Sequence, residues 1–307
     1  MPGNTRTWRA GRPVDLARIV SPLRHGSGDP TSRFVRGVFW RASNTPDGPA
    51  TLSLSRVADE VSAQAWGPGG PWLLDSVPLL LGEADDWSSL DVGDHAVLRQ
   101  VRRQFPGVRL CRTGLVLDSL VPACLEQRVT GQEAFRAWRE LVWAHGSPAP
   151  GPNEPKLWLS PTPAALLHVP NWDWHRFGVD SQRYQAIRAA ASVAARLEEC
   201  VEMSAAGDCS AAMRRLRLVP GVGPWTAAET AVRALGDADA VSVGDFHLKN
   251  MVGYALTGAP RTEEAAMMSM LEPWRGQRAR VIRLIELSAL KPPRYGPRLD
   301  YQDIPAI

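Results

Sequence analysis

Two segments of the sequence hold residues whose types and spacing suggest chemistry. The first, residues 218–226, places two glycines and two prolines between two helical patterns. The second, residues 241–249, runs extended as far as Asp245 and then becomes helical. Asp245 follows Gly223 by 22 positions. An aspartate at the start of a helix is most often an N-cap, so its chemical meaning depends on the first segment.

The first segment predicts a tight hairpin between two helices. One helix stops at Pro220 and the next begins near Pro224, because proline suits the first position of a helix. Gly221 and Gly223 are expected to adopt positive φ angles and to keep side chains out of the turn. Bare backbone N–H groups at a helix N-terminus bind anions, and a DNA phosphate is the obvious anion.

Two other interpretations of the glycines stay open on this segment alone. One is an ordinary helix–helix turn. The other is a dinucleotide fingerprint, G-x-G-x-x-G, with an acidic residue about twenty positions further on. Against the fingerprint, Thr226 occupies the third glycine position, and a basic helix precedes the segment where a buried strand would be needed.

Composition excludes several classes of protein. The chain has 307 residues, of which 44% are hydrophobic and 22% charged, which suits a globular protein of one large domain or two ordinary domains. A net charge of +3 does not by itself indicate nucleic-acid binding. The sequence has no long apolar run, no apolar core of a signal peptide and no C-x-x-C pair among its four cysteines. We therefore expect a cytoplasmic protein with reduced thiols, no membrane association and no metal bound by cysteine.

The elements that must position these residues are a small sheet and a large helical body. Alternating residues separated by turn residues predict an antiparallel sheet from residue 34 to about residue 74. From residue 91 the spacing becomes helical, and a Pro/Gly-rich loop interrupts it at 146–155. The fold class expected is α+β and mainly helical. Helix starts or helices are expected at residues 160–163, 182–201, 209–218, 225–235, 246–256, 262–271 and 275–288, with an irregular tail at 291–307.

The hairpin with an aspartate at this separation resembles the helix-hairpin-helix DNA glycosylase superfamily, and within it the AlkA-like (3-methyladenine DNA glycosylase II) branch. The resemblance covers residues 115–288, and the sheet is consistent with the N-terminal subdomain of that branch. It implies a sheet subdomain at 1–110, a helical glycosylase domain at 111–290 and a tail at 291–307. The further motifs that resemble the family are residues 125–130 with Ala134, residues 161–166 followed by Tyr184, Ile187 and Ala190, and residues 271–275.

This resemblance implies a monomeric DNA glycosylase of base excision repair, associated with the nucleoid and acting on double-stranded DNA that contains damaged bases. Such an enzyme flips the base out of the stack and hydrolyses its N-glycosidic bond. Asp245 is the implied catalytic carboxylate, because it can stabilise positive charge on the sugar and orient the attacking water. The implied substrates are alkylated purines such as 3-methyladenine and 7-methylguanine. A glycosylase for a deaminated or oxidised base and a non-catalytic DNA-binding protein stay open as alternatives.

The same resemblance implies roles for the residues around the hairpin. Gly221, Val222 and Gly223 would hold the DNA backbone through their N–H groups, and Thr226 through its hydroxyl. Arg128, which follows Gln127, stands where the family inserts a wedge into the duplex. The hairpin carbonyls could hold a structural monovalent cation, and no other cofactor is expected.

The lysine content bears on the type of reaction. The chain has three lysines, Lys156, Lys249 and Lys291, against 32 arginines. Bifunctional members of the superfamily place a lysine two positions after the second hairpin glycine, where this chain has Trp225. A Schiff-base lyase step is therefore not expected. Lys249, one helical turn after Asp245, is expected to contact a phosphate, Asp245 or only solvent.

The base pocket draws on several side chains, each of which has an ordinary structural role as its alternative. Most of the 12 tryptophans must pack in the core. Trp225 and Trp274 lie in motif positions and are better candidates for stacking on a cationic base than Trp172 and Trp174. The other candidates are Glu229 and Arg283, near positions where the AlkA-like pocket carries aromatics, and His247; arginine runs at 214–217 and 275–283 predict phosphate contacts or solvated faces.

Overall fold

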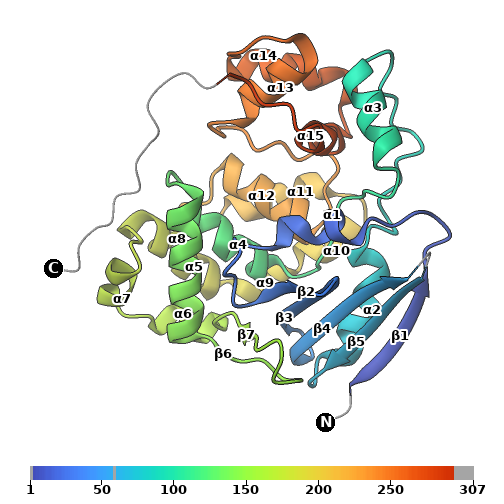
Figure 1. Cartoon of the computed structure of the whole chain (residues 1–307). Coiled ribbons are helices and arrows are strands. Elements are labelled where there is room, and N and C mark those ends of the chain that lie inside the picture. The colour runs from blue at the N-terminus through green and yellow to red at the C-terminus, as the bar shows by residue number, and fades with distance from the viewer. Residues whose placement is uncertain (1–2, 58–59, 294–307) are drawn as a thin grey trace.

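The computed structural model describes residues 3–57 and 60–293. Figure 1 shows a sheet at one end, a helical body in the middle and a second group of helices at the far end. The strands are β1 (Asn4–Arg9), β2 (Ser32–Val35), β3 (Val38–Thr45), β4 (Gly48–Val57), β5 (Glu60–Trp66), β6 (Ser147–Pro148) and β7 (Trp158–Leu159). The expected α+β class, with a small antiparallel sheet and a mainly helical body, is confirmed.

Helices make up most of the remaining structure. In the first half of the chain they are α1 (Leu16–Val20), η1 (Ser21–Leu23), α2 (Gly70–Leu80), α3 (Ala96–Gln104), α4 (Val116–Leu125) and α5 (Gly131–His145). In the second half they are α6 (Pro163–His168), α7 (Asn171–Arg176), α8 (Ser181–Ser192), α9 (Ala194–Glu198), α10 (Cys200–Ala205), α11 (Cys209–Arg217), α12 (Pro224–Ala234), α13 (Leu248–Thr257), α14 (Glu264–Leu271), η2 (Glu272–Trp274) and α15 (Arg278–Leu287). Within the described ranges, no helix combines the length and apolarity needed to cross a bilayer.

The five-stranded sheet has the order β1-β5-β4-β3-β2, and every pair is antiparallel. The hairpin of β2 and β3 turns at Arg36 and Gly37, whose positive φ angles of 49° and 80° fit a two-residue hairpin turn. Apolar side chains of the sheet pack against α1, η1 and α2 in one core cluster that includes Phe39, Leu52 and Leu54. The sequence located β2 to β5 but not β1, and residues 70–74, expected at the end of the sheet, begin α2 instead.

The helical body is packed around α4, which is buried along almost its whole length. Trp174 is fully buried there and stacks on Tyr184, with 5.9 Å between the ring centroids. The start predicted at residues 160–163 is confirmed, because the Thr162 hydroxyl caps α6. The single helix expected at 182–201 is divided into α8, α9 and α10. The first break occurs because the backbone of Val193 leaves the helical region at φ −120° and ψ 20°, and the second is a turn at Glu199.

The third core cluster joins segments from both ends of the chain. Residues from Trp87 to Val108, including α3, pack against α13, α14 and α15. Figure 1 shows α3 beside these three helices, far from the sheet that precedes it in sequence. The buried pair of Arg280 and Asp85, 2.7 Å apart, reinforces this contact. The divisions proposed at residues 110 and 290 stay predictions, and residues 294–307 of the expected tail lie outside the described residues.

A buried carboxylate ties the strand region to the helical body. Asp29 is fully buried and accepts five hydrogen bonds, from the backbone N–H groups of His25 and Thr31, the hydroxyls of Thr31 and Ser32, and Nε1 of Trp138 on α5. Burial alone would raise the pKa of Asp29, but the charge of His25 and these donors lower it below its ordinary value.

Candidate active site

The hairpin, residues 218–223, connects α11 to α12 as the sequence predicted. α11 ends at Arg217, and α12 begins at Pro224 with Gly223 as its N-cap. Gly221 has a φ of +84°, and a Cβ there would lie 2.7 Å from the Cβ of Ala186. Glycine is therefore required at this position by both backbone conformation and close packing.

Gly223 differs from what was expected. Its φ is −84°, so the prediction of a positive φ at this residue is wrong. A Cβ added at Gly223 would meet nothing within 4 Å, so the protein's own packing does not require a glycine. The position leaves the backbone open to approach from outside, which suits a ligand that contacts the hairpin directly.

The free N–H groups of the hairpin are not all those that were predicted. The Val222 N–H donates to the carbonyl of Val219 at 3.0 Å, and the Val222 side chain is buried, so this residue is not available to an anion. In this region, the backbone N–H groups with no acceptor among the described residues are those of Gly221, Gly223, Trp225 and Thr226. These donors lie in the hairpin and at the N-terminus of α12, where backbone N–H groups can bind an anion, and they are called the anion-binding surface below.

Gln127 connects the predicted wedge position to the hairpin. Its Nε2 donates to the carbonyl of Gly221 at 3.0 Å and to the hydroxyl of Thr226 at 2.8 Å. Thr226 is only 2% exposed, so its hydroxyl serves this internal contact, and the predicted phosphate contact through it is wrong. The neighbouring Arg128 is exposed and has a φ of 55°, a conformation uncommon for residues other than glycine.

The backbone oxygens of the hairpin are partly free. The carbonyls of Val219, Gly221 and Gly223 accept protein hydrogen bonds. Those of Pro220 and Val222 have no donor within the part of the chain that the structure describes. This arrangement is compatible with the monovalent cation implied by the resemblance, and that cation stays a prediction.

Asp245 ends the short segment of residues 241–245, hereafter the catalytic segment. Its Oδ1 accepts hydrogen bonds from the N–H groups of His247 (2.7 Å) and Leu248 (2.8 Å), which holds the turn that leads into α13. Its Oδ2 accepts one from Nε1 of Trp225 at 3.0 Å. A carboxylate has about four acceptor sites, so roughly one remains for a water or a substrate.

Trp225 brings the hairpin and Asp245 together. It is the second residue of α12, so its backbone N–H belongs to the anion-binding surface while its half-buried indole reaches Asp245. A phosphate bound at the hairpin and the Asp245 carboxylate would therefore both lie next to Trp225. This placement permits a group bonded to the phosphate, such as a sugar, to lie near Oδ2.

Glu229 lies one turn after Trp225 on α12. Its carboxylate accepts a hydrogen bond from the Ser242 hydroxyl and pairs with Arg233 at 2.5 Å. Burial alone would lower the pKa of Arg233, but the carboxylates of Glu229 and Glu126 raise it above its ordinary value. Both oxygens of Glu229 thus have protein partners, and its predicted role in hydrogen bonding to a base stays a prediction.

Two other predicted site residues lie near Asp245 without binding it through their side chains. His247 is exposed, and its ring makes an edge contact with the exposed ring of Phe246. Lys249 has neither an ion pair nor a hydrogen bond among the described residues, so the predicted contact of its amine with Asp245 is not formed. Both side chains remain accessible.

The remaining pocket candidates make no described hydrogen bond or ion pair with the hairpin or with Asp245. Trp274 donates from Nε1 to the carbonyl of Asp91 at 2.7 Å and packs in the third core cluster. Arg283 bonds to Glu286 and to the carbonyl of Arg18, so it joins α15 to α1. Of the two weaker candidates, Trp174 is a core residue, whereas Trp172 is 74% exposed on α7.

The two arginine runs differ in how many of their charges are available. In the run at 275–283, every arginine pairs with a carboxylate, the partners being Glu272, Asp239, Asp85 and Glu286. The predicted phosphate contacts from this run are therefore not supported. In the run at 214–217, Arg215 pairs with Glu199, whereas Arg217 is exposed beside the hairpin and has no partner in the described ranges.

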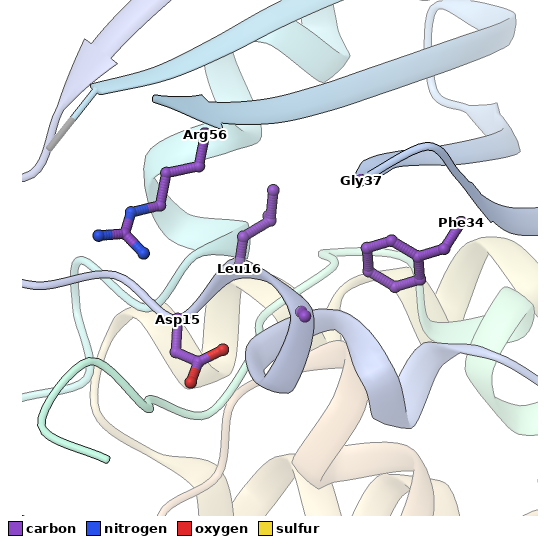
Figure 2. Close-up of a pocket in the computed structure, with 6 residues that line it drawn as sticks. Asp15, Leu16, Phe34, Gly37 and Arg56 are labelled. Carbon is purple, nitrogen blue, oxygen red and sulfur yellow. The ribbon is translucent and has the colours of Figure 1, made fainter. Parts of the chain in front are cut away.

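A surface cavity of about 340 Å³ lies away from these residues. It is lined by Asp15, Leu16, Ala17, Phe34, Gly37 and Arg56. Figure 2 shows Asp15 and Arg56 at one end of the cavity and the Phe34 ring at the other, between α1 and the strands. None of the candidate catalytic or DNA-contacting residues lines it, so the cavity does not belong to the candidate active site.

Three residues that contribute to the site were not singled out from the sequence. Ser242 holds Glu229, Glu264 on α14 accepts the Gly244 N–H at 2.7 Å, and Gln127 holds the hairpin. A local signal existed only for the pairing of Glu229 with Arg233, because glutamate and arginine four residues apart on a helix are neighbours.

Comparison with known proteins gives a relative in sequence and several in structure. No family model matches the chain. Over 202 residues, 66% of the chain, it is 30% identical to the "Probable bifunctional transcriptional activator/DNA repair enzyme AlkA" of two Mycobacterium tuberculosis strains, CDC 1551 and H37Rv. The match spans 38% of the length of these curated relatives.

Solved structures share the fold at low sequence identity. A 3-methyladenine DNA glycosylase from Archaeoglobus fulgidus has a TM-score of 0.74 and 16% identity, covering 92% of this chain and 98% of its own. An 8-oxoguanine glycosylase/lyase from Clostridium acetobutylicum, bound to double-stranded DNA, has a TM-score of 0.70 and 11% identity, covering 94% and 97%. The fold is therefore common to proteins whose substrates differ.

Proposed function

We propose that the chain belongs to the helix-hairpin-helix DNA glycosylase superfamily, in its AlkA-like branch, and that it is a DNA glycosylase of base excision repair. The observation that carries this proposal is the contact of Trp225 with Asp245, which places a carboxylate beside the anion-binding surface of the hairpin. A flipped nucleotide held by its phosphate would present its sugar to Asp245.

The proposed reaction is hydrolysis of the N-glycosidic bond. As the bond between the sugar carbon and the base nitrogen breaks, its electron pair leaves with the base and positive charge develops on the sugar. The Asp245 carboxylate stabilises that charge and accepts a proton from the water that attacks the sugar. The products are a free base and an abasic site, and no metal or organic cofactor enters these steps.

Alkylated purines of the 3-methyladenine and 7-methylguanine type are the proposed substrates. An alkylated purine is already cationic, so it departs without a general acid, and the single carboxylate at the hairpin is sufficient. The indole of Trp225 beside Asp245 provides an aromatic face for a cationic base. The proposed partner is double-stranded DNA that contains such a base, bound by a monomer.

The test uses duplex oligonucleotides that each carry one defined lesion, alkylated, deaminated or oxidised, and measures the free base released. We expect release from the alkylated substrates. Asp245→Asn should lower the single-turnover rate about a hundredfold to ten-thousandfold, the range for loss of a positioned acid or base. The amide oxygen of asparagine can accept the same two hydrogen bonds from His247 and Leu248, so α13 should stay folded.

The matched control is Asp94→Asn, because the Asp94 side chain is fully exposed and far along the chain from the hairpin. It should release base at the wild-type rate. Release of only a deaminated or oxidised base would refute the substrate class. DNA binding without release of any base would instead identify a non-catalytic DNA-binding protein, and full activity of Asp245→Asn would remove Asp245 from the mechanism.

A further inference from the structure

The catalytic segment, residues 241–245, has no helix or strand of its own and is held by side chains from other elements. Trp225 donates to Oδ2 of Asp245, the Ser242 hydroxyl donates to Glu229, and the Gly244 N–H donates to Glu264. Gly244 has a φ of +94° and nothing near its Cβ position, so little local packing restricts the backbone just before Asp245. These three contacts hold the catalytic segment to α12 and α14, in addition to the hydrogen bonds that Asp245 makes with His247 and Leu248.

Two of these contacts are made by residues of α12. Trp225 and Glu229 are four residues apart, so they lie on the same face of the helix, one turn from each other. Their partners, Asp245 and Ser242, are three residues apart on the catalytic segment. The segment consequently runs beside α12 and is fixed to it at both ends.

Glu229 is itself fixed. Arg233 donates from Nη1 to the carboxylate and to the carbonyl of Glu229, and from Nε to the carbonyl of Pro22 at 3.0 Å. The side chains of Glu229 and Arg233 are only 19% and 20% exposed. Arg233, on the same helix, thus holds the Glu229 carboxylate, which accepts the hydrogen bond from the Ser242 hydroxyl. Arg233 is itself held by the carbonyl of Pro22 in η1.

We propose that Glu229 and Ser242 are positioning residues that set the place of Asp245 relative to the sugar of a flipped nucleotide. This inference rests on the proposed function, because it gives Asp245 the catalytic role. Displacement of a reacting group by about 1 Å can reduce a rate on the order of a hundredfold. Loss of the Ser242 hydroxyl frees one end of the catalytic segment while leaving the pair of Glu229 and Arg233 intact.

The experiment compares the full-length wild-type protein with Ser242→Ala and with a control, Ser269→Ala. Ser269 is an exposed serine of α14 whose hydroxyl donates only to Ala265. Single-turnover release of the base that the wild type excises, the Kd for the same duplex and thermal unfolding are measured. Ser242→Ala should slow release roughly ten- to a hundredfold, with Kd and the unfolding temperature close to wild type, and Ser269→Ala should match the wild type throughout.

A double-mutant comparison separates positioning from general damage. In an Asp245→Asn background, Ser242→Ala should cause little further loss, because its effect passes through the carboxylate. An equal fold-loss in both backgrounds, or a wild-type rate for Ser242→Ala, would refute the positioning role. Failure of the proposed function is distinguishable, since the wild-type protein itself would then release no base.

Discussion

Trp225 and Asp245, twenty positions apart in the chain, are joined by a hydrogen bond of 3.0 Å from the indole Nε1 to Oδ2. One side chain thereby connects the start of α12, where the free N–H groups of the hairpin lie, to the carboxylate. Trp225 also fills the position that holds a nucleophilic lysine in bifunctional members of the superfamily that the sequence resembles. An indole can donate a hydrogen bond there but cannot form a Schiff base.

Trp225→Phe should lower the single-turnover rate of base release about tenfold, which corresponds to ~1.4 kcal/mol of transition-state stabilisation. Phenylalanine keeps an aromatic face but leaves Oδ2 without its donor, so only the Oδ1 contacts orient the carboxylate. Trp172→Phe, at an exposed position of α7, is the control and should have no effect. Equal rates for the two variants would show that the indole N–H does not support catalysis.

Strand scission provides a second prediction. The wild-type protein should convert a lesion duplex to an abasic product that breaks only after alkali treatment, and borohydride should trap no covalent complex. Lys249, the lysine nearest Asp245 in sequence, makes no described contact with that carboxylate. Lys249→Ala should therefore leave the reaction products unchanged, whereas strand cleavage that disappears in Lys249→Ala would establish a lyase activity and overturn this assignment.

Gln127→Ala should weaken binding to a lesion duplex while leaving the helical body folded. The amide of Gln127 supports the hairpin at Gly221 and Thr226, and it precedes the exposed Arg128. Loss of a neutral hydrogen-bonding side chain of this kind costs about 1 kcal/mol, or roughly a fivefold rise in Kd. Gln132→Ala, an exposed change five residues away, is the control, and an equal rise in its Kd would argue against a specific role for Gln127.

Asp29→Asn should destabilise the fold by about 3 kcal/mol, because an amide nitrogen would replace an oxygen that faces buried N–H and O–H donors. Urea unfolding measures the change, and Asp47→Asn, in an exposed turn, should be nearly neutral. A comparable loss of stability in both variants would contradict the structural role assigned to Asp29.

The difference in the free energy of unfolding between the wild type and Asp29→Asn should depend on pH, because the pKa of Asp29 is lowered in the folded protein. A carboxyl group of this kind stabilises the fold above its unfolded pKa and loses that stabilisation as the pH falls through its folded pKa. The difference between wild type and Asp29→Asn should therefore be complete above roughly pH 4 and decrease below it. A difference that grows on acidification would contradict this assignment.

Local sequence signals predicted the elements whose ends depend on single residues. Proline and glycine determined where α11 stops and α12 begins, and the Thr162 hydroxyl marked the start of α6. β1 gives no such signal, because Trp8 is its one buried residue and its pairing with β5 joins residues that are 51 (Arg9 and Glu60) to 61 (Asn4 and Ala65) positions apart. The start of α2 also gives no clear helix signal, because Gly70 and Pro71 are typical turn residues.

The sequence also predicted the candidate site only in part. Spacing indicated the hairpin and Asp245, but it does not determine which way a side chain points. The contacts of Trp225 with Asp245 and of Ser242 with Glu229 therefore could not be deduced from the sequence. Glycine permits a positive φ at position 223, but the observed conformation is one that other residues also adopt.

The packing of α3 against α13, α14 and α15 has a consequence for synthesis of the protein. α3 ends at Gln104, and α13 begins only at Leu248, so the apolar face of α3 leaves the ribosome long before its partners. At translation rates of roughly 5–20 residues per second, the delay is on the order of ten seconds. The core beside Asp245 is thus the last to close, and a chaperone that protects nascent apolar surface would act on α3 during this interval.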